Sequence, residues 1–344
     1  MFLSIGARLI INVEALNAVE TVGNVTKHRR APMIVPEATG YRLVYVPAAS
    51  GESLANAFQR NLVEAVKQIY AKDKVPCPLT PWDERCEFVK FMDRQHLTPS
   101  LSSIVDSIGK EPLMELKHRF EKTAIQESIV ADVGGFLYAE EDLPVKRTSR
   151  VQFGYMLPVY DAVEHVAVEA QFHARHVPSE MGTGGQRPAQ MIYYTETASA
   201  VYGITINVDV DGIGKASLVK VSEVVSDDER RRRLKATLYA LAGLFVGEGF
   251  GAKLSRFLPV RSVESMVAVI SSPVAFTVSP PHYRGYMADT LERLKGIGSL
   301  TNRLGLSFSK EAFAYGGAQR EDVVRVGTVE ELFSAVTDAV LKGL

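Results

Sequence analysis

The chain has 344 residues, of which 46% are hydrophobic and 23% charged, and its formal net charge is −1. This composition is typical of a globular protein with a sizeable core, in one large domain with insertions or in two domains. No apolar run approaches the roughly 18 residues of a membrane span. The first residues lack the basic region and cleavage site of a signal peptide, so we expect a cytoplasmic protein with no membrane partner.

The cysteine pattern argues against a metal centre. Cys77 and Cys86 are the only cysteines, and no histidine lies near them at ligand spacing. Two cysteines alone do not complete a zinc site, and we interpret them as free thiols. We expect no metal and no cofactor.

The first 125 residues predict two strands, one long helix and an insertion. Residues 3–13 and 41–46 have the alternation or the β-branched content of strands. Ser50 is placed to cap a helix whose apolar residues keep helical spacing up to about Tyr70. Residues 72–125 differ in composition from the helix before them, with three prolines near the start, and predict an insertion of short helices and loops.

The middle of the chain predicts adjacent strands joined by a long extension. A basic run precedes a strand at residues 151–157, and a second strand begins near His165 and ends in residues 173–176. A loop rich in glycine, proline and serine follows. Residues 191–210 are rich in β-branched and aromatic side chains and predict a further strand.

The last third predicts helices around one strand. Ser226 is placed to cap a helix with a buried stripe, and a glycine-rich turn follows it. Residues 263–270 predict a strand, residues 286–295 a helix, and Thr328 is placed to cap a last helix.

Without its insertion the order is strand, helix, strands, helix, strand, which is the split βαβ or ferredoxin-like pattern. We therefore predict an α+β fold with a discontinuous ferredoxin-like domain at residues 1–71 and 126–280. The helical insertion at 72–125 interrupts it, and residues 281–344 are expected to pack on it as helices and a strand.

Four basic clusters lie beside turn-forming residues. One such run is usually a solvated face, but four in a chain of near-zero net charge favour a polyanionic partner, RNA or DNA. The clusters are Lys27-His28-Arg29-Arg30, residues 146–150, residues 173–176 and residues 253–256.

The glycine-rich turn predicts phosphate contacts. Its spacing fits neither the nucleotide-hydrolase loop nor the dinucleotide fingerprint. Three glycines within five residues, at 247, 249 and 251, exceed what a helix cap needs, and they leave backbone N–H groups free to form an anion-binding concavity. Lys253 and Arg256 follow directly.

Two histidines admit two interpretations. His173 and His176 are a candidate acid–base pair for a ribonuclease that cleaves without metal. Residues three apart at the end of a strand point in different directions, however, which favours contact with a base or a phosphate. The chain has no H-E-x-x-H metal motif and no G-x-S-x-G nucleophile elbow.

Taken together, six segments resemble one family, and they keep its order. The family is the CRISPR-associated DevR-type backbone subunit of the archaeal type I-A Cascade, in the RAMP superfamily. The segments are residues 24–29, 50–53, 131–136, 146–150, 169–173 and 251–259.

The resemblance implies a palm of modified RNA-recognition-motif type, a helical insertion and a thumb-like flexible loop, here residues 174–192. It implies a protein without catalytic residues that coats CRISPR RNA. Copies would stack head to tail along the guide, beside other Cascade subunits, and present it for pairing with a target DNA strand in antiviral defence. Such a system leaves sequence reading to base pairing.

The resemblance and the basic clusters together give a set of expected RNA contacts, with Met181 as a candidate thumb wedge. The competing hypothesis is a metal-independent endoribonuclease of the related CRISPR RNA-processing family, using His173 and His176. A third is a protein-interaction module that acts without nucleic acid. The expected RNA contacts are Lys27, His28, Arg29, Arg30, Ser50, Lys146, Arg147, Ser149, Arg150, His173, Arg175, His176, Gly249, Gly251, Lys253 and Arg256.

Overall fold

The protein is built on a mixed sheet with three long antiparallel strands at its centre. In this computed structural model β1 pairs with β11 on one side and with β14 on the other. The central strands are β1 (Phe2–Glu14), β11 (Met191–Asp209) and β14 (Val260–Ser272). The structure describes residues 1–344 except 92, 141, 176–190, 248–249 and 318–321.

Short strands extend this sheet on both sides. β8 and β9 pair with the free edge of β11, and β15 and β16 continue beyond β14. The sheet therefore contains the order β14-β1-β11-β8, with antiparallel neighbours throughout. The added strands are β8 (Val151–Phe153), β9 (Leu157–Pro158), β15 (Ser309–Tyr315) and β16 (Val324–Val326).

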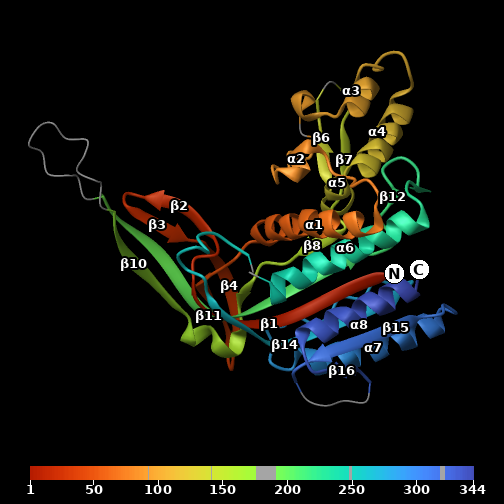
Figure 1. The fold of residues 1–344 in the computed structure, drawn as a ribbon. Coiled ribbons are helices and arrows are strands. Elements are labelled where there is room, and N and C mark those ends of the chain that lie inside the picture. Colours follow the sequence, from red (N-terminus) through yellow and green to blue (C-terminus); the bar gives the residue numbers. More distant parts are fainter. Residues whose placement is uncertain (92, 141, 176–190, 248–249, 318–321) are drawn as a thin grey trace, which may run out of the picture.

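Helices cover both faces, because the central strands are apolar on both. On β14, Met266 and Ala268 belong to the main core, whereas Val267 and Val269 belong to a second core on the opposite face. This is the two-residue alternation of a strand. The main core takes in α1 (Gly51–Asp73), α6 (Asp227–Val246) and α8 (Val329–Lys342), and the other takes in α7 (Tyr286–Arg303) (Figure 1).

The long helices begin where the sequence predicts. The Ser50 hydroxyl accepts a hydrogen bond from Ser53 N at 3.3 Å at the start of α1, and Ser226 does the same for Glu229 N at the start of α6. Thr328 caps α8 in the same way. α7 begins at Tyr286 as predicted but runs eight residues past the predicted end, and Ile297 in this added part packs against the second core.

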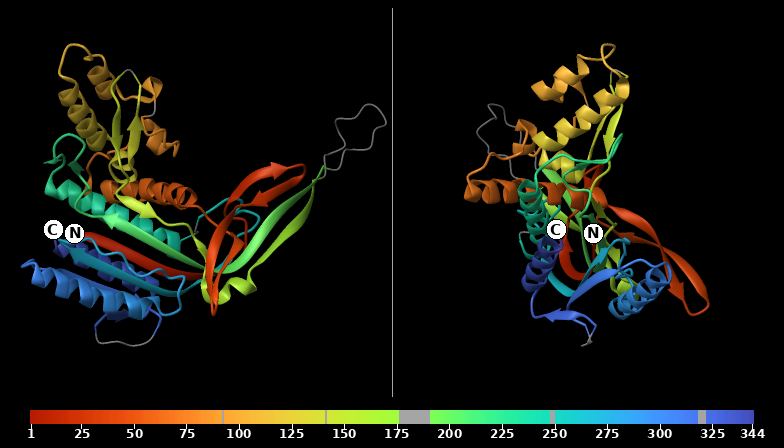
Figure 2. Two further views of the ribbon diagram at one scale, coloured as in Figure 1. Left: turned by 180° about the vertical axis from the view of Figure 1, so that it is seen from behind. Right: turned by 90° about the vertical axis from the view of Figure 1, so that its right-hand side faces the viewer.

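An arm of four strands projects from the body (Figure 2). β10 pairs antiparallel with the first half of β11, and β3 joins the other edge of β11 in parallel, with β2 outside it. Between the strands predicted at residues 3–13 and 41–46 the sequence analysis predicted no further strand. That was wrong, because short β-branched runs form three strands there: β2 (Ala18–Val22), β3 (Val25–His28) and β4 (Arg30–Glu37). β4 pairs with β5 (Gly40–Pro47) in a separate hairpin, and β10 covers Ala167–Arg175.

The predicted strand at residues 151–157 is interrupted. β8 ends at Phe153, Gly154 N donates a hydrogen bond to Thr205 O at 2.9 Å, and pairing with β11 resumes only at β9, so Tyr155 lies outside the named strands. The basic run before it is not part of this sheet. Val145–Arg147 forms β7, which pairs with β6 (Phe136–Tyr138) in a separate lobe.

That lobe holds the predicted short helices around its own small core. Phe120 stacks on Tyr138 at 5.1 Å, and the core includes residues from Phe91 to Val145. The sequence change at residue 72 thus marks where the chain leaves the main body (Figure 1). The helices are α2 (Pro81–Glu84), α3 (Pro99–Val105), α4 (Leu113–Glu127) and α5 (Ile129–Gly134), with a 3-10 turn at Arg94–His96.

Small elements complete the chain. Lys215–Ala216 (β12) pairs with Ser222–Glu223 (β13), and a 3-10 turn covers Tyr160–His165. Cys77 and Cys86 are free, as predicted. None of the helices that the structure describes is long and apolar enough to span a bilayer.

A buried charge cluster joins the lobe to the main body. Asp132 on α5 is fully buried and accepts hydrogen bonds from Arg147 on β7, from Arg233 on α6 at 2.8 Å, and from Gly214 N at 2.9 Å. Glu121 on α4 also meets Arg147, at 3.3 Å. These charges neutralise one another out of contact with water, so removing one leaves the others without compensation.

The first prediction concerns this cluster. We expect Asp132→Asn to lower the free energy of unfolding by roughly 3–5 kcal/mol, because two buried guanidinium groups lose their shared carboxylate. Urea denaturation followed by circular dichroism measures the change. The matched control is Asp73→Asn, which removes the partly exposed partner of Arg232 and should cost less than about 1 kcal/mol. Equal effects of the two substitutions would contradict the assigned role of Asp132.

Candidate nucleic-acid interface

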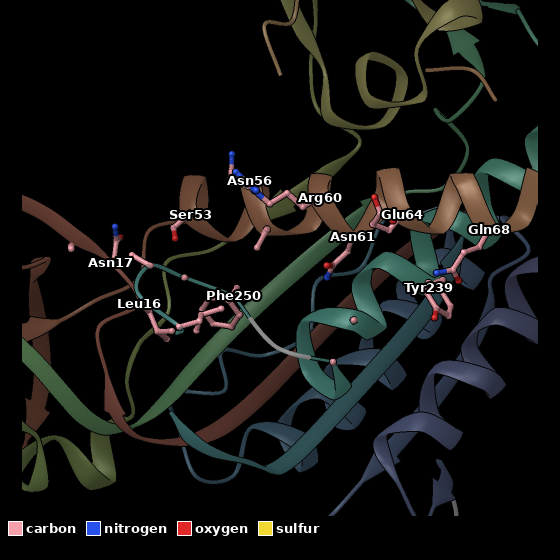
Figure 3. Close-up of a pocket in the computed structure, with 17 residues that line it drawn as sticks. Leu16, Asn17, Ser53, Asn56, Arg60, Asn61, Glu64, Gln68, Tyr239 and Phe250 are labelled. Carbon is pink, nitrogen blue, oxygen red and sulfur yellow. Dashed lines mark hydrogen bonds between the residues drawn. The ribbon is translucent and has the colours of Figure 1, made fainter. Parts of the chain in front are cut away.

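A groove of about 870 Å³ runs beside α1 (Figure 3). One wall is the polar side of α1, and the other walls are the end of α6 and two loops at residues 16–18 and 250–254. Apolar residues of those loops, such as Leu16 and Phe250, line the groove, while Asn56 and Arg60 are exposed on α1. Such a groove offers hydrogen-bond donors, one cation and apolar surface side by side.

The α1 side chains are partly held in place by their neighbours. Arg60 Nε donates to Asn56 Oδ1 at 3.1 Å, one helical turn away. Asn61 Nδ2 donates to Ala240 O on α6 at 3.3 Å, which ties α1 to α6 at the groove. The guanidinium of Arg60 still has donors to spare for a ligand, since a guanidinium carries five N–H groups.

The glycine-rich turn closes one end of the groove by a close backbone approach. Gly251 has φ of +110°, and a Cβ there would lie 2.7 Å from the Cα of Leu16. Ala252 N donates to Leu16 O at 2.9 Å. A side chain at 251 would therefore separate the two loops, which explains this glycine structurally. The predicted phosphate contact by the backbone of Gly251 stays a prediction.

Past this turn, two cations lie against the base of the arm. Lys253 Nζ donates to Thr195 Oγ1 at 3.3 Å, and Arg256 Nη1 donates to the hydroxyl of Tyr193 at 2.6 Å. Burial, and then the charge of Arg256, lower the pKa of Lys253. We call Tyr193, Thr195, Lys253, Arg256 and His173 the arm-base cluster.

His173 is packed within this cluster. Its ring stacks on Tyr193 at 5.0 Å, the residue opposite on β11, and meets the edge of Phe257 at 5.4 Å. Its Nε2 atom is buried and has no hydrogen-bond partner. The aromatic contacts fasten the turn to the arm and favour a packing role over an acid–base role for this ring.

The buried carboxylate of Glu14 holds the loop at residues 16–18, which lines the groove, in place. Glu14 accepts hydrogen bonds from Tyr202 Oη at 2.7 Å and from Leu16 N at 2.7 Å, and its Oε1 lies 2.8 Å from His28 Nε2. Burial works to lower the pKa of His28, but its contacts with Glu14 and the charge of Glu196 outweigh burial and raise the pKa above 6.5. His28 is thus a structural residue here, so we leave it out of the proposed interface.

The other predicted RNA contacts near His28 differ in how exposed their side chains are. Lys27 Nζ pairs with Glu196 at 2.9 Å but stays 43% exposed, and Arg30 is exposed. The Nε of Arg29 is buried without a partner. The Ser50 hydroxyl is buried and occupied as the cap of α1, so it too leaves the proposed interface.

The run at residues 146–150 does not form a cationic face. Arg147 is fully enclosed by Asp132, Glu121 and backbone carbonyls, and Arg150 pairs with Asp209 at 2.9 Å. Ser149 Oγ bonds to backbone carbonyls, and Lys146 is exposed on β7. The structure therefore divides the predicted cations between the arm and the lobe, and Arg147 is not available to a ligand.

Four predicted residues cannot be placed. His176, Met181 and Gly249 lie outside the described residues, as does the side chain of Arg175. Their roles stay predictions.

The sequence interpretation missed several residues of the site. Asn56 and Arg60 lie four apart on a predicted helix, and that spacing puts them on one face. Tyr193 and Thr195 lie two residues apart on a predicted strand, which gives them a common face. Both spacings are visible in the sequence, but neither identifies the residues as ligand-binding. Within the described part of the chain, no group of three or more His, Cys, Asp or Glu side chains could hold a metal ion.

Sequence comparison connects this architecture with CRISPR-associated proteins. The family described as CRISPR-associated negative auto-regulator DevR/Csa2 matches residues 5–291. The CRISPR-associated aCascade subunit Cas7/Csa2 2 of Saccharolobus solfataricus is 36% identical, over 94% of this chain and 96% of its own. A CRISPR-associated protein Cas7/Cst2/DevR of Methanocaldococcus jannaschii is 30% identical, over 98% of this chain and 99% of that protein.

A solved structure agrees at the level of fold. A chain of a CRISPR RNA-guided surveillance complex, in a pre-nicking state, aligns with a TM-score of 0.50 over 99% of this chain and 100% of that chain, at 11% identity. This likeness supports the mixed α+β fold. The sequence matches define a CRISPR-associated protein. The chain belongs to the DevR/Csa2 family, as the order of its motifs predicted.

The second prediction follows from the raised pKa of His28. A folded-state pKa above 6.5 means that the His28–Glu14 ion pair contributes its full stability below that value and loses it as pH rises through the folded-state pKa. We expect the difference in melting temperature between the wild type and His28→Gln to be larger at about pH 6 than at about pH 8, with the wild type more stable. Thermal denaturation at both values measures this. A constant difference between the two proteins would show that the ion pair does not titrate there.

Proposed function

We propose that this protein is a non-catalytic RNA-binding backbone subunit of a Cascade-type complex in the cytoplasm. The observation that carries the proposal is the path from the α1 groove, with Arg60, through the glycine-rich turn to Lys253 and Arg256. Cations, amides and aromatic rings along one track suit single-stranded nucleic acid bound without sequence readout.

The core is proposed to be a modified ferredoxin-like, RNA-recognition-motif palm. Its support is the order β14-β1-β11-β8 with α1 and α6 packed on one face. The lobe after residue 72 would be the helical insertion, the β10–β11 extension would carry the thumb, and residues 281–344 would form the outer layer.

Copies of the chain are proposed to stack head to tail along a guide CRISPR RNA and to present it to a target DNA strand, beside other Cascade subunits. A head-to-tail contact that does not close generates an open filament, which matches a long linear ligand. The name of the Saccharolobus relative, an aCascade subunit, supports the same assembly.

The third prediction tests the track itself. We expect the triple variant Arg60→Gln, Lys253→Asn, Arg256→Gln to weaken RNA binding and to flatten its salt dependence. Each phosphate contact adds about 0.7 to the slope of log affinity against log salt, so three lost contacts reduce the slope by about 2. Asparagine is chosen at 253 because φ is +58° there.

The matched control changes three cations outside the track, Lys110, Arg119 and Arg303, to glutamine. Fluorescence anisotropy with two RNAs of unrelated sequence, from low to moderate salt, gives both slopes. The control should bind like the wild type, and the two RNAs, matched in base composition, should bind alike. Strict dependence on one sequence, or equal losses in both triple variants, would contradict the proposal.

The fourth prediction separates this function from the endoribonuclease. A packed His173 ring with a buried Nε2 does not favour proton transfer. We expect a CRISPR repeat RNA incubated with the protein in EDTA to stay intact on a denaturing gel. Cleavage that disappears in His173→Ala would establish the endoribonuclease instead.

A further inference from the structure

We propose that a second pocket, on the other side of α1, takes the base of one unstacked nucleotide, with preference for bases that carry carbonyl oxygens. The inference rests on the proposed function, because the nucleotide would belong to the strand that follows the groove. The pocket has a volume of about 370 Å³ and lies between α1, the insertion lobe and β8 with the residues that flank it. That volume is within the range of small-ligand sites.

Position makes the pocket accessible to the same strand. The first turns of α1 separate the two cavities: Ser53 and Asn56 line the groove, whereas Glu52 and Ala55 line the pocket. A strand that crosses this part of α1 passes both. One nucleotide can then leave the stack while its neighbours stay on the track.

Lys90 supplies an unpaired cation to the pocket. Its Nζ has one contact, Gly134 O at 3.5 Å, which is at the outer limit of a hydrogen bond, and no described acidic residue forms an ion pair with it. Burial lowers the pKa of Lys90. A half-buried ammonium without a good acceptor is stabilised by any ligand that brings one.

The neighbours of Lys90 favour a base over a phosphate. Glu52 also lines the pocket and is exposed, so its carboxylate repels a phosphodiester entering from solvent. A base carbonyl oxygen is neutral and accepts from a lysine, as guanine O6 does. Adenine has no carbonyl oxygen and offers Lys90 only ring-nitrogen acceptors, so we expect it to gain less from this contact.

Tyr155 supplies the ring on which such a base would stack. It directly follows the break after Gly154, lines the pocket and is 45% exposed. Phe153, two residues earlier, packs on Phe58 at 5.5 Å and belongs mainly to the core. An exposed aromatic beside an unpaired lysine is the combination that binds single-stranded bases.

The test compares full-length variants on two RNAs, oligouridine and oligoadenosine, by anisotropy. We expect Tyr155→Ala to weaken both by about fivefold or more, the lower end for one lost base stack. Lys90→Met should weaken oligouridine clearly more than oligoadenosine. Tyr155→Phe keeps the ring, and Lys110→Met removes an exposed lysine elsewhere on the lobe, so both should bind like the wild type. Circular dichroism melts confirm that each variant is folded.

A second readout locates the base directly. Photocrosslinking with 5-bromouridine RNA, followed by mass spectrometry, should map a crosslink to Tyr155 in the wild type. Normal oligouridine binding by Tyr155→Ala and Lys90→Met, with no crosslink at Tyr155, would refute the proposed base-binding role of the pocket. If the triple variant of the track still loses affinity in that case, the proposed function stands. If the wild type binds neither RNA, both fail.

Discussion

The continuity of β11 is the constraint on which the whole site depends. One strand pairs with β1 and β8 inside the body and with β10 and β3 in the arm. Because side chains alternate along a strand, Tyr193 and Thr195 lie on one face at a fixed distance from the core residues further along. Lys253 and Arg256 bind to that face. The position of the cationic turn is therefore set by a strand anchored in the sheet, and a slip of one residue would turn the whole face away.

Burial explains where reasoning from charge succeeded and where it did not. Residues 146–150 and 253–256 look alike in sequence, as short basic runs beside turns. In the structure Arg147 is enclosed by Asp132 and Glu121, whereas Arg256 stays exposed. The difference lies in acids far away in sequence. Asp132 serves Arg147 and also Arg233, which is 101 residues away from it. A local pattern cannot show such partners, so it cannot tell a solvated cation from a structural one.

Much of the framework was predictable because its signals are local. Ser50, Ser226 and Thr328 cap α1, α6 and α8 because a hydroxyl before an amphipathic run satisfies free N–H groups. The β10–β11 part of the arm was predicted, but its outer strands β2 and β3 were missed, because β3 joins β11 across the fold and only two of its residues pair there. Tyr155 was read as part of a strand face. The break at Gly154 puts it beside Lys90, a residue of the insertion, and no spacing in the sequence predicts that meeting.

The small number of cations on the track has a consequence for the proposed assembly. With Arg60, Lys253 and Arg256 as the exposed or partly exposed positive groups of the track, one copy would release few counterions and gain modest affinity from charge alone. Copies bound to the same strand would raise one another's effective concentration, so binding strength would grow with the number of neighbours and not with the charge of each. In the proposed filament, a chain of net charge −1 would thus hold a polyanion firmly while a single copy would bind weakly. Weak single contacts would also leave most bases free, which a guide must keep available for pairing.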